Sequence, residues 1–146
     1  MENKTNKMHV TCDAKSVNEA FARMTVMAFM TDMNPTLDEL EDVKTAVSEA
    51  VTNAIIHGYE DENKQVELSC TREGEKLIVV VEDKGVGIPD VEEARQPFYT
   101  TKPEQERSGM GFAFMEAFMD EIQVVSKVGE GTRVTMTKYI ARDCDQ

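Results

Sequence analysis

The chain has 146 residues, of which 40% are hydrophobic and 30% are charged, and its formal net charge is -12 at pH 7. This length and composition predict a single globular domain, residues 1–146, that can bury a core. The acidity argues against direct nucleic-acid binding, which requires a basic surface against the phosphates.

The cysteines and the hydropathy pattern exclude further classes. Cys12, Cys70 and Cys144 are odd in number and show no C-x-x-C spacing, so neither a disulfide scaffold nor a zinc site is expected. No apolar stretch approaches the roughly 20 residues that cross a bilayer, and the first residues lack the apolar region of a secretory signal. We therefore expect no membrane association and a cytoplasmic location.

The first elements in chain order are a strand and a helix. Residues 8–12 (MHVTC) predict a short strand. Ser16 and Glu19 then form the S-x-x-E pattern of a capping box, which predicts the start of a helix. Its apolar residues recur at helical spacing: Val17, Phe21, Met24 and Ala28.

A second, longer helix follows the break at Asn34-Pro35. Thr36 and Glu39 form another capping box, and Gly58 is a plausible end. Its apolar stripe consists of Leu40, Val43, Val47, Ala50 and Ala54.

The second half of the chain predicts two hairpins separated by a long loop. Residues 66–70 alternate and REGEK turns the chain into KLIVVVED, where the unbroken LIVVV predicts a strand buried on both faces. Residues 91–107 lack a clear period, and a loop of that length in a compact domain is usually functional, for example a lid. A buried helix and a hairpin around GEGT follow; the apolar residues of that helix are Met110, Phe114, Met115, Phe118 and Met119.

Together these elements predict an α+β fold. It is a two-layer α/β sandwich in which helices cover one face of a mixed sheet.

Six of the eight glycines form three G-x-G pairs at element boundaries. The pairs are Gly85/Gly87, Gly109/Gly111 and Gly129/Gly131. Glycine is the ordinary residue for turns, and a turn is the favoured interpretation of Gly129/Gly131. After Asp83, the letters fit neither a calcium loop, a Walker A loop nor a dinucleotide-binding fingerprint.

The long helix places Glu49, Asn53 and His57 at i, i+4 and i+8, away from its apolar stripe. This pattern is compatible with a solvated face. However, no lysine or arginine occurs between Lys44 and Lys64, and a carboxylate and an amide on a mostly uncharged face suit a lined pocket better.

Four stretches carry a family resemblance that spans almost the whole chain. SEAVTNAIIHG resembles the N box, EDKGVGI the first glycine box and RSGMGF the second glycine box of the GHKL ATPase and kinase superfamily, and GEGTRV is similar to its closing threonine segment. Within that superfamily the chain looks most like the small serine kinases that act as anti-sigma factors. The resemblance implies the Bergerat ATP-binding fold with an ATP lid, and ATP/ADP and Mg²⁺ as cofactors.

The resemblance also implies roles for individual residues. Glu49 would be the general base, and Asn53 would coordinate Mg²⁺. Asp83 would accept a hydrogen bond from the adenine amine, with Thr132 nearby, while Gly85 and Gly87 let the backbone pass close to the base. The start of a helix would wrap the phosphates, with these residues: Arg107, reaching the γ-phosphate, and Ser108, Gly109, Met110 and Gly111.

As partners, the resemblance implies a sporulation sigma factor of RNA polymerase, an anti-anti-sigma factor that is phosphorylated on serine, and a second copy in a homodimer. Arg23 and the first helix are a hypothetical contact region. A histidine kinase domain would need a phosphoacceptor helix, for which the chain has no room. The remaining alternative is a nucleotide-binding anti-sigma module without significant kinase turnover. The intact Glu49, Asn53 and Asp83 weigh against it.

Overall fold

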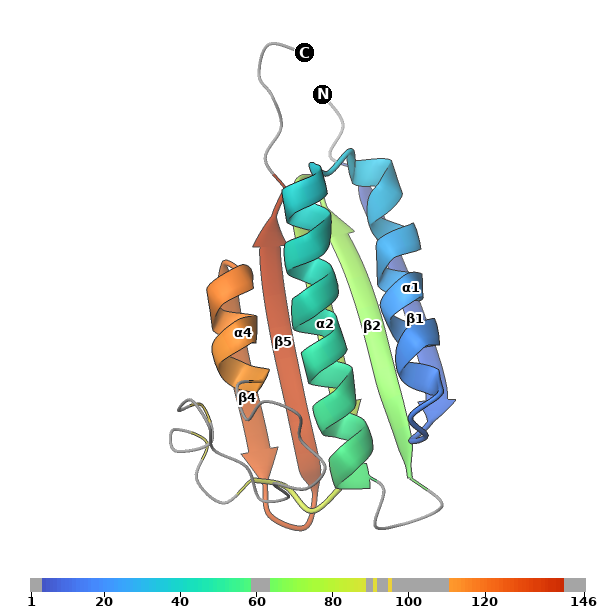
Figure 1. Cartoon of the computed structure of the whole chain (residues 1–146), viewed down its shortest axis with the longest axis vertical. Coiled ribbons are helices and arrows are strands. Elements are labelled where there is room, and N and C mark those ends of the chain that lie inside the picture. The colour runs from blue at the N-terminus through green and yellow to red at the C-terminus, as the bar shows by residue number, and fades with distance from the viewer. Residues whose placement is uncertain (1–3, 59–63, 89–90, 92–94, 96–110, 141–146) are drawn as a thin grey trace.

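The computed structural model describes residues 4–58, 64–88, 91, 95 and 111–140. These residues form two layers, with helices packed over one face of a sheet (Figure 1). Cys12 and Cys70 are free thiols, and Cys144 lies outside the described residues.

The sheet has five strands in the order β1-β2-β3-β5-β4, and every neighbouring pair is antiparallel. The strands are β1 (Thr5–Asp13), β2 (Gln65–Glu73), β3 (Lys76–Asp83), β4 (Glu121–Lys127) and β5 (Gly131–Tyr139). The α+β sandwich is therefore confirmed, whereas the expectation of a mixed sheet is wrong.

The connections explain why the sheet is antiparallel. Between β1 and β2 the chain runs through two helices, so it crosses the sheet twice and β2 starts where β1 ended. Strands β3 and β4 are each antiparallel to β5, so they run in the same direction, but β5 lies between them. No parallel pair of neighbours results.

Among the described residues, the helices with defined bounds are α1 (Asn18–Met30), the short 3-10 helix η1 (Thr31–Met33), α2 (Leu37–Gly58) and α4 (Gly111–Phe118). The second capping box is confirmed: the Thr36 N–H donates to Glu39 Oε1 at 2.8 Å, and the Glu39 N–H donates to Thr36 Oγ1 at 3.1 Å. The first is wrong. Helix α1 has no side-chain cap, and the Glu19 N–H donates to the backbone carbonyl of Ser16 instead.

The core lies between α2 and the centre of the sheet. Val43, Val47 and Ala50 of the predicted α2 stripe are buried, and they belong to one cluster with Leu68, Val79 and Met136 of the sheet. Helix α2 lies between α1 and α4 (Figure 1).

Helix α1 faces the opposite way from its predicted stripe. Val17, Phe21, Met24 and Ala28 are exposed, and the residues that enter the core are Ala22, Val26 and Met30. The helix is apolar on two sides, so periodicity alone did not identify the side that faces the sheet.

Strand β3 is buried on one face only. Leu77, Val79 and Val81 face the helices and are buried, whereas Ile78 and Val80 face outward and are half-buried. The prediction of two buried faces is wrong because helices cover only one side of the sheet.

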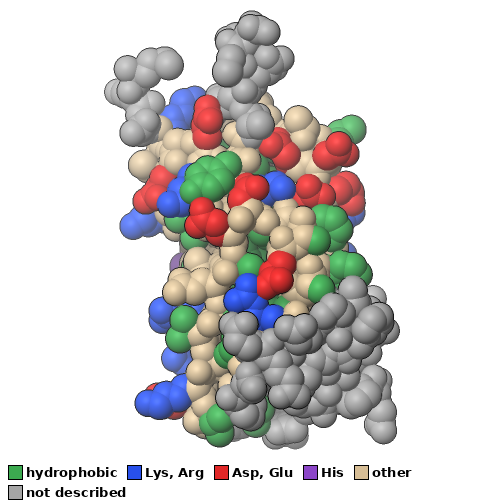
Figure 2. Space-filling view, turned by 90° about the vertical axis from the view of Figure 1, so that its left-hand side faces the viewer, with side chains coloured by type: hydrophobic (Ala, Val, Ile, Leu, Met, Phe, Trp, Pro, Cys, Tyr) green, Lys and Arg blue, Asp and Glu red, His purple; other side chains and the backbone are tan. Residues whose placement is uncertain are grey.

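The surface carries charges of both signs. Figure 2, which views the side of the molecule formed by α4 and β4, shows acidic and basic side chains interspersed over its upper half.

Among the described helices, none combines the length and the apolar character needed to cross a membrane.

Candidate functional site

Four segments implicated by the sequence meet at one end of the sandwich (Figure 1). They are the last turns of α2, the end of β3, the β4–β5 turn and the end at which α4 begins. The predicted N box, first glycine box and threonine segment therefore come together, although they are far apart in the sequence.

Asp83 is the last residue of β3 and is only 4% exposed. Its Oδ1 accepts a hydrogen bond of 2.8 Å from the Gly85 N–H, and the Thr132 N–H also donates to this carboxylate. Burial raises the pKa of the Asp83 carboxyl from 3.8 to about 6, and the two backbone donors and the Lys64 charge oppose that rise. At pH 7.5 the group is therefore a buried, ionised acceptor.

Thr132 and Ser126 extend a row of polar side chains from Asp83 across three strands. Thr132 on β5 is the register partner of Asp83 on β3 and of Ser126 on β4. The Ser126 and Thr132 hydroxyl oxygens lie 2.8 Å apart. Sequence reasoning found Asp83 and Thr132 but missed Ser126. No motif marks this serine; only the register of the β4–β5 hairpin, which pairs it with Thr132, could have identified it.

The first glycine box rests on the β4–β5 turn. The Gly129 N–H donates to the Val86 carbonyl at 2.9 Å, and the Ile88 N–H donates to Ser126 Oγ at 2.7 Å. A Cβ on Gly87 would lie 2.3 Å from the Lys127 carbonyl oxygen. Glycine is therefore required at position 87 by this contact as well as by its φ of +79°.

The pair Gly129/Gly131, interpreted from the sequence as a turn, combines two roles. Gly129 has φ +83° and open space around it, as expected of a turn residue. Gly131 has φ +107°, and a Cβ there would lie 2.0 Å from the Asp83 carbonyl oxygen. The second glycine thus lets β5 approach the end of β3 and brings Thr132 beside Asp83.

On α2, Asn53 is 8% exposed and Glu49, one turn earlier, is half-buried. This burial excludes a fully solvated face, and the lined pocket stays a prediction. His57 lies in the last turn of α2. Among the described residues no three His, Cys, Asp or Glu side chains cluster as a metal site.

The donor set fits Mg²⁺ held chiefly by a nucleotide. This ion usually takes one or two protein oxygens and completes its coordination with phosphates and water. The carboxamide of Asn53 supplies such an oxygen, and the buried acceptor Asp83 fits an amino group of a base.

Several predicted residues lie outside the described residues: Arg107, Ser108, Gly109 and Met110. Gly111 is the first residue of α4, as expected for a phosphate-binding helix start. Most of the predicted lid, 91–107, is also outside. Within it, the Arg95 guanidinium pairs with the Glu116 carboxylate on α4.

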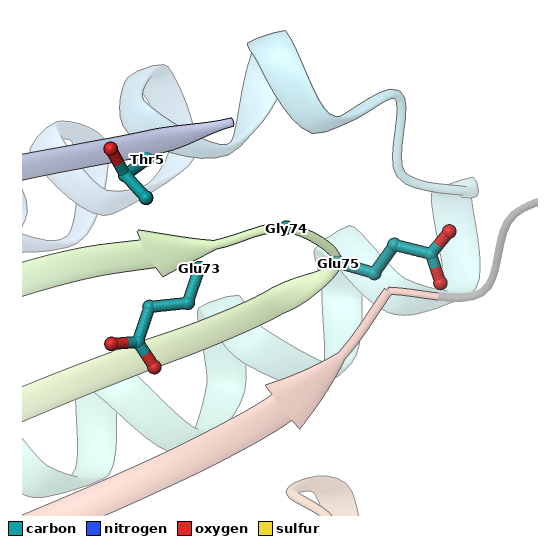
Figure 3. Close-up of a pocket in the computed structure, with 4 residues that line it drawn as sticks. All are labelled: Thr5, Glu73, Gly74 and Glu75. Atoms are coloured by element: carbon teal, nitrogen blue, oxygen red, sulfur yellow. The ribbon is translucent and has the colours of Figure 1, made fainter. Parts of the chain in front are cut away.

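A cavity of about 600 Å³ lies at the opposite end of β3, next to the β2–β3 turn. Thr5, Glu73, Gly74 and Glu75 line it, and the two carboxylates point in different directions (Figure 3). Because no polar groups converge there, this cavity is not the candidate site.

Comparison with known proteins agrees with this geometry. Residues 11–138 match the family of the histidine kinase-like ATPase domain. The chain is 58% identical to an anti-sigma F factor of Geobacillus kaustophilus, with 94% of each chain covered. It is 56% identical to one of Clostridium kluyveri, with 91% of this chain and 94% of that protein covered.

Two solved structures share the fold. The RsbU and RsbW domains of Rv1364c from Mycobacterium tuberculosis match with a TM-score of 0.70 at 21% identity, over 94% of this chain and 33% of that one. The catalytic domain of the histidine kinase ThkA matches with a TM-score of 0.57 at 17% identity, over 98% of this chain and 100% of that one.

Proposed function

This chain belongs to the histidine kinase-like ATPase domain family and, within it, to the anti-sigma F factors, and from that premise we propose a double function. It binds and inhibits the sporulation sigma factor F of RNA polymerase. It also transfers the terminal phosphate of ATP to a serine of an anti-anti-sigma factor. Residues 1–146 act as one ATP-binding domain in the cytoplasm, where RNA polymerase works.

The observation that carries the proposal is the buried Asp83 carboxylate beside Thr132 and the glycine turn. A buried carboxylate costs free energy unless its acceptors are satisfied. Here two backbone N–H groups satisfy it in part, and the pKa of about 6 indicates that its charge is still poorly compensated. A ligand that donates a hydrogen bond, such as the amino group of adenine, would supply the missing partner.

We assign the remaining roles, binding of Mg²⁺ and phosphates and removal of the serine proton, to the other segments at this end of the sandwich. Phosphoryl transfer needs positioned phosphates, neutralised charge and an oriented nucleophile. Asn53 would hold Mg²⁺, which supplies charge neutralisation at the phosphates. Free N–H groups at the start of α4 would bind phosphate oxygens together with Arg107, Ser108, Gly109, Met110 and Gly111. Glu49 would take the proton from the serine hydroxyl.

A nucleotide-binding anti-sigma module without significant kinase turnover is the alternative. Such a module would bind the base of the nucleotide with the same residues. It would differ from the kinase only in that Glu49 would not act as a general base. The half-buried Glu49 one turn before the buried Asn53 favours the kinase, because the base would stand beside the phosphates rather than in bulk water.

A partner surface is proposed on α1. Its exposed face carries Phe21 and Met24, next to the exposed Val17 that precedes the helix, and Phe21 is 67% exposed. Arg23 lies beside this face with its Nε 3.6 Å from Glu19 Oε2. We assign this face to the homodimer and to the sigma contact that the family implies. Phe21→Asp should weaken self-association and sigma binding; unchanged sedimentation and unchanged sigma binding would remove the assignment.

The function is tested by incubating the purified chain with sigma factor F, an anti-anti-sigma factor and γ-labelled ATP. We expect retention of the sigma factor in the presence of nucleotide and label on a serine of the antagonist. Retention without label would select the module without turnover. Absence of both would reject the proposal.

A further inference from the structure

Ser126 is the point at which three parts of the candidate site meet. Its Oγ accepts a hydrogen bond from the Ile88 N–H at 2.7 Å, donates to the Gly131 carbonyl at 3.1 Å and lies 2.8 Å from Thr132 Oγ1. One hydroxyl thus joins the first glycine box, the β4–β5 turn and the side chain beside Asp83.

The hydrogen-bonding capacity of a serine hydroxyl fixes the direction of the third bond. Such a group has one proton to donate and two lone pairs that accept. The proton goes to the Gly131 carbonyl, and one lone pair accepts from Ile88. The bond between the two hydroxyls therefore uses the proton of Thr132, and the Ser126 oxygen is fully satisfied.

The consequence for Thr132 is a locked orientation. Its side chain is buried, with 5% of the residue exposed, and its proton is directed toward Ser126. Only its lone pairs remain for a ligand. Asp83, its cross-strand partner, is likewise an acceptor. We name Asp83 and Thr132 the acceptor pair. Because both side chains can only accept, they favour a base that directs a hydrogen-bond donor, such as an amino group, toward them.

We propose that Ser126 is a specificity-determining residue of the nucleotide site: by locking the Thr132 hydroxyl, it makes the acceptor pair select a 6-aminopurine over a 6-oxopurine. The inference rests on the proposed ATP binding and says how that site would distinguish adenine from other purines. A hydroxyl that is free to turn can donate as well as accept, and so tolerates either group. Ser126 acts through Thr132 and does not itself contact the base.

The test compares the dissociation constants for ATP and for inosine triphosphate, whose base carries an oxo group at position 6. In Ser126→Ala we expect the preference for ATP to fall roughly two- to tenfold, the range of one hydrogen bond. Thr132→Val should lower it similarly, because the hydroxyl is then gone. In the double variant Ser126→Ala should have no further effect, because its action passes through Thr132.

Two controls separate selectivity from general damage. Ser126→Thr keeps the hydroxyl and should restore the preference. Ser69→Ala removes a hydroxyl on the outer face of β2, where it contacts His9, and should leave the preference unchanged. If Ser126→Ala does not fold, Ser126→Thr against Ser126→Val makes the same comparison with side chains of equal shape.

An unchanged preference in folded Ser126→Ala would overturn the proposal, as would an equal loss in the Thr132→Val background. Failure of the wild-type chain to bind ATP would instead reject the proposed function, so the two failures are distinguishable.

Discussion

Asp83 and Thr132 face each other across β3 and β5, and the N–H of Thr132 donates to the Asp83 carboxylate. The pair thus combines a buried negative charge with a backbone donor that compensates it only in part. Two measurable consequences follow from this relationship.

The first concerns stability and pH. Because burial raises the pKa of Asp83 from 3.8 to about 6, the folded state holds this proton more tightly than the unfolded state does. The stability that the protonated group contributes is complete below pH 3.8 and is lost as the pH rises through about 6. At pH 7.5, Asp83→Asn should therefore increase the free energy of unfolding without nucleotide by up to about 3 kcal/mol.

Urea titrations of both proteins at pH 7.5 and pH 4 would measure this difference. The advantage of Asp83→Asn should shrink toward zero at the lower pH. An advantage that is equal at both values would mean that Asp83 is not the group responsible.

The second consequence concerns affinity. The same Asp83→Asn should weaken ATP binding by roughly 10- to 150-fold, since a hydrogen bond to a charged acceptor is lost and an amide can present a donor instead. Isothermal titration measures the change. Glu82→Gln is the matched control, because Glu82 is the neighbouring carboxylate on the outer face of β3, where it pairs with Arg133 at 3.3 Å. Equal affinity of the Asp83 variant and the wild type would exclude an adenine contact.

Glu49→Gln should keep ATP binding and reduce phosphoryl transfer by about 10²- to 10⁴-fold, because it removes the proposed base and almost no volume. Initial rates of label transfer to the antagonist measure the effect. Glu41→Gln, an exposed carboxylate on the same helix paired with Lys44 at 3.1 Å, should transfer at the wild-type rate. If the Glu49 variant turned over at the wild-type rate, another group would have to accept the proton of the serine hydroxyl.

The glycines of the β4–β5 turn provide a matched pair for stability. Gly129→Ala meets open space and should lose only about 1 kcal/mol of unfolding free energy, the cost of a positive φ. Gly131→Ala should lose a further ~1–3 kcal/mol, because its Cβ would overlap the Asp83 carbonyl. Thermal unfolding of the two variants measures the difference, and similar losses would contradict the close approach of β5 and β3.

The two serine and threonine patterns before the helices offer another comparison. Thr36→Ala should lower the free energy of unfolding by about 1 kcal/mol, since it removes the acceptor of the Glu39 N–H. Ser16→Ala should have almost no effect, because α1 has no side-chain cap. If denaturant titrations gave both variants the same loss of unfolding free energy, the hydrogen bond between the Glu39 N–H and Thr36 Oγ1 would not be the cause.

These outcomes also show how far the sequence predicts the structure. Helix α2 was predicted well because its cap, stripe and end are local features within one run of residues. Helix α1 is apolar on two sides, so the sheet decides which side is buried, and that decision is not local. Ser126 was missed for the same reason: its role arises from pairing with Thr132 and from the approach of Ile88, segments that lie apart in the sequence.

The place of β5 between β3 and β4 has a consequence for biosynthesis. Because β5 lies between β3 and β4, the chain emerging from a ribosome carries β3 with one unpaired edge until residues 131–139 have been made. An unpaired edge of an apolar strand can pair with other chains. The nascent protein is therefore most exposed to aggregation just before its last strand is synthesised. If nucleotide binds as proposed, beside Asp83 and Thr132, it would protect the chain only after that strand has docked.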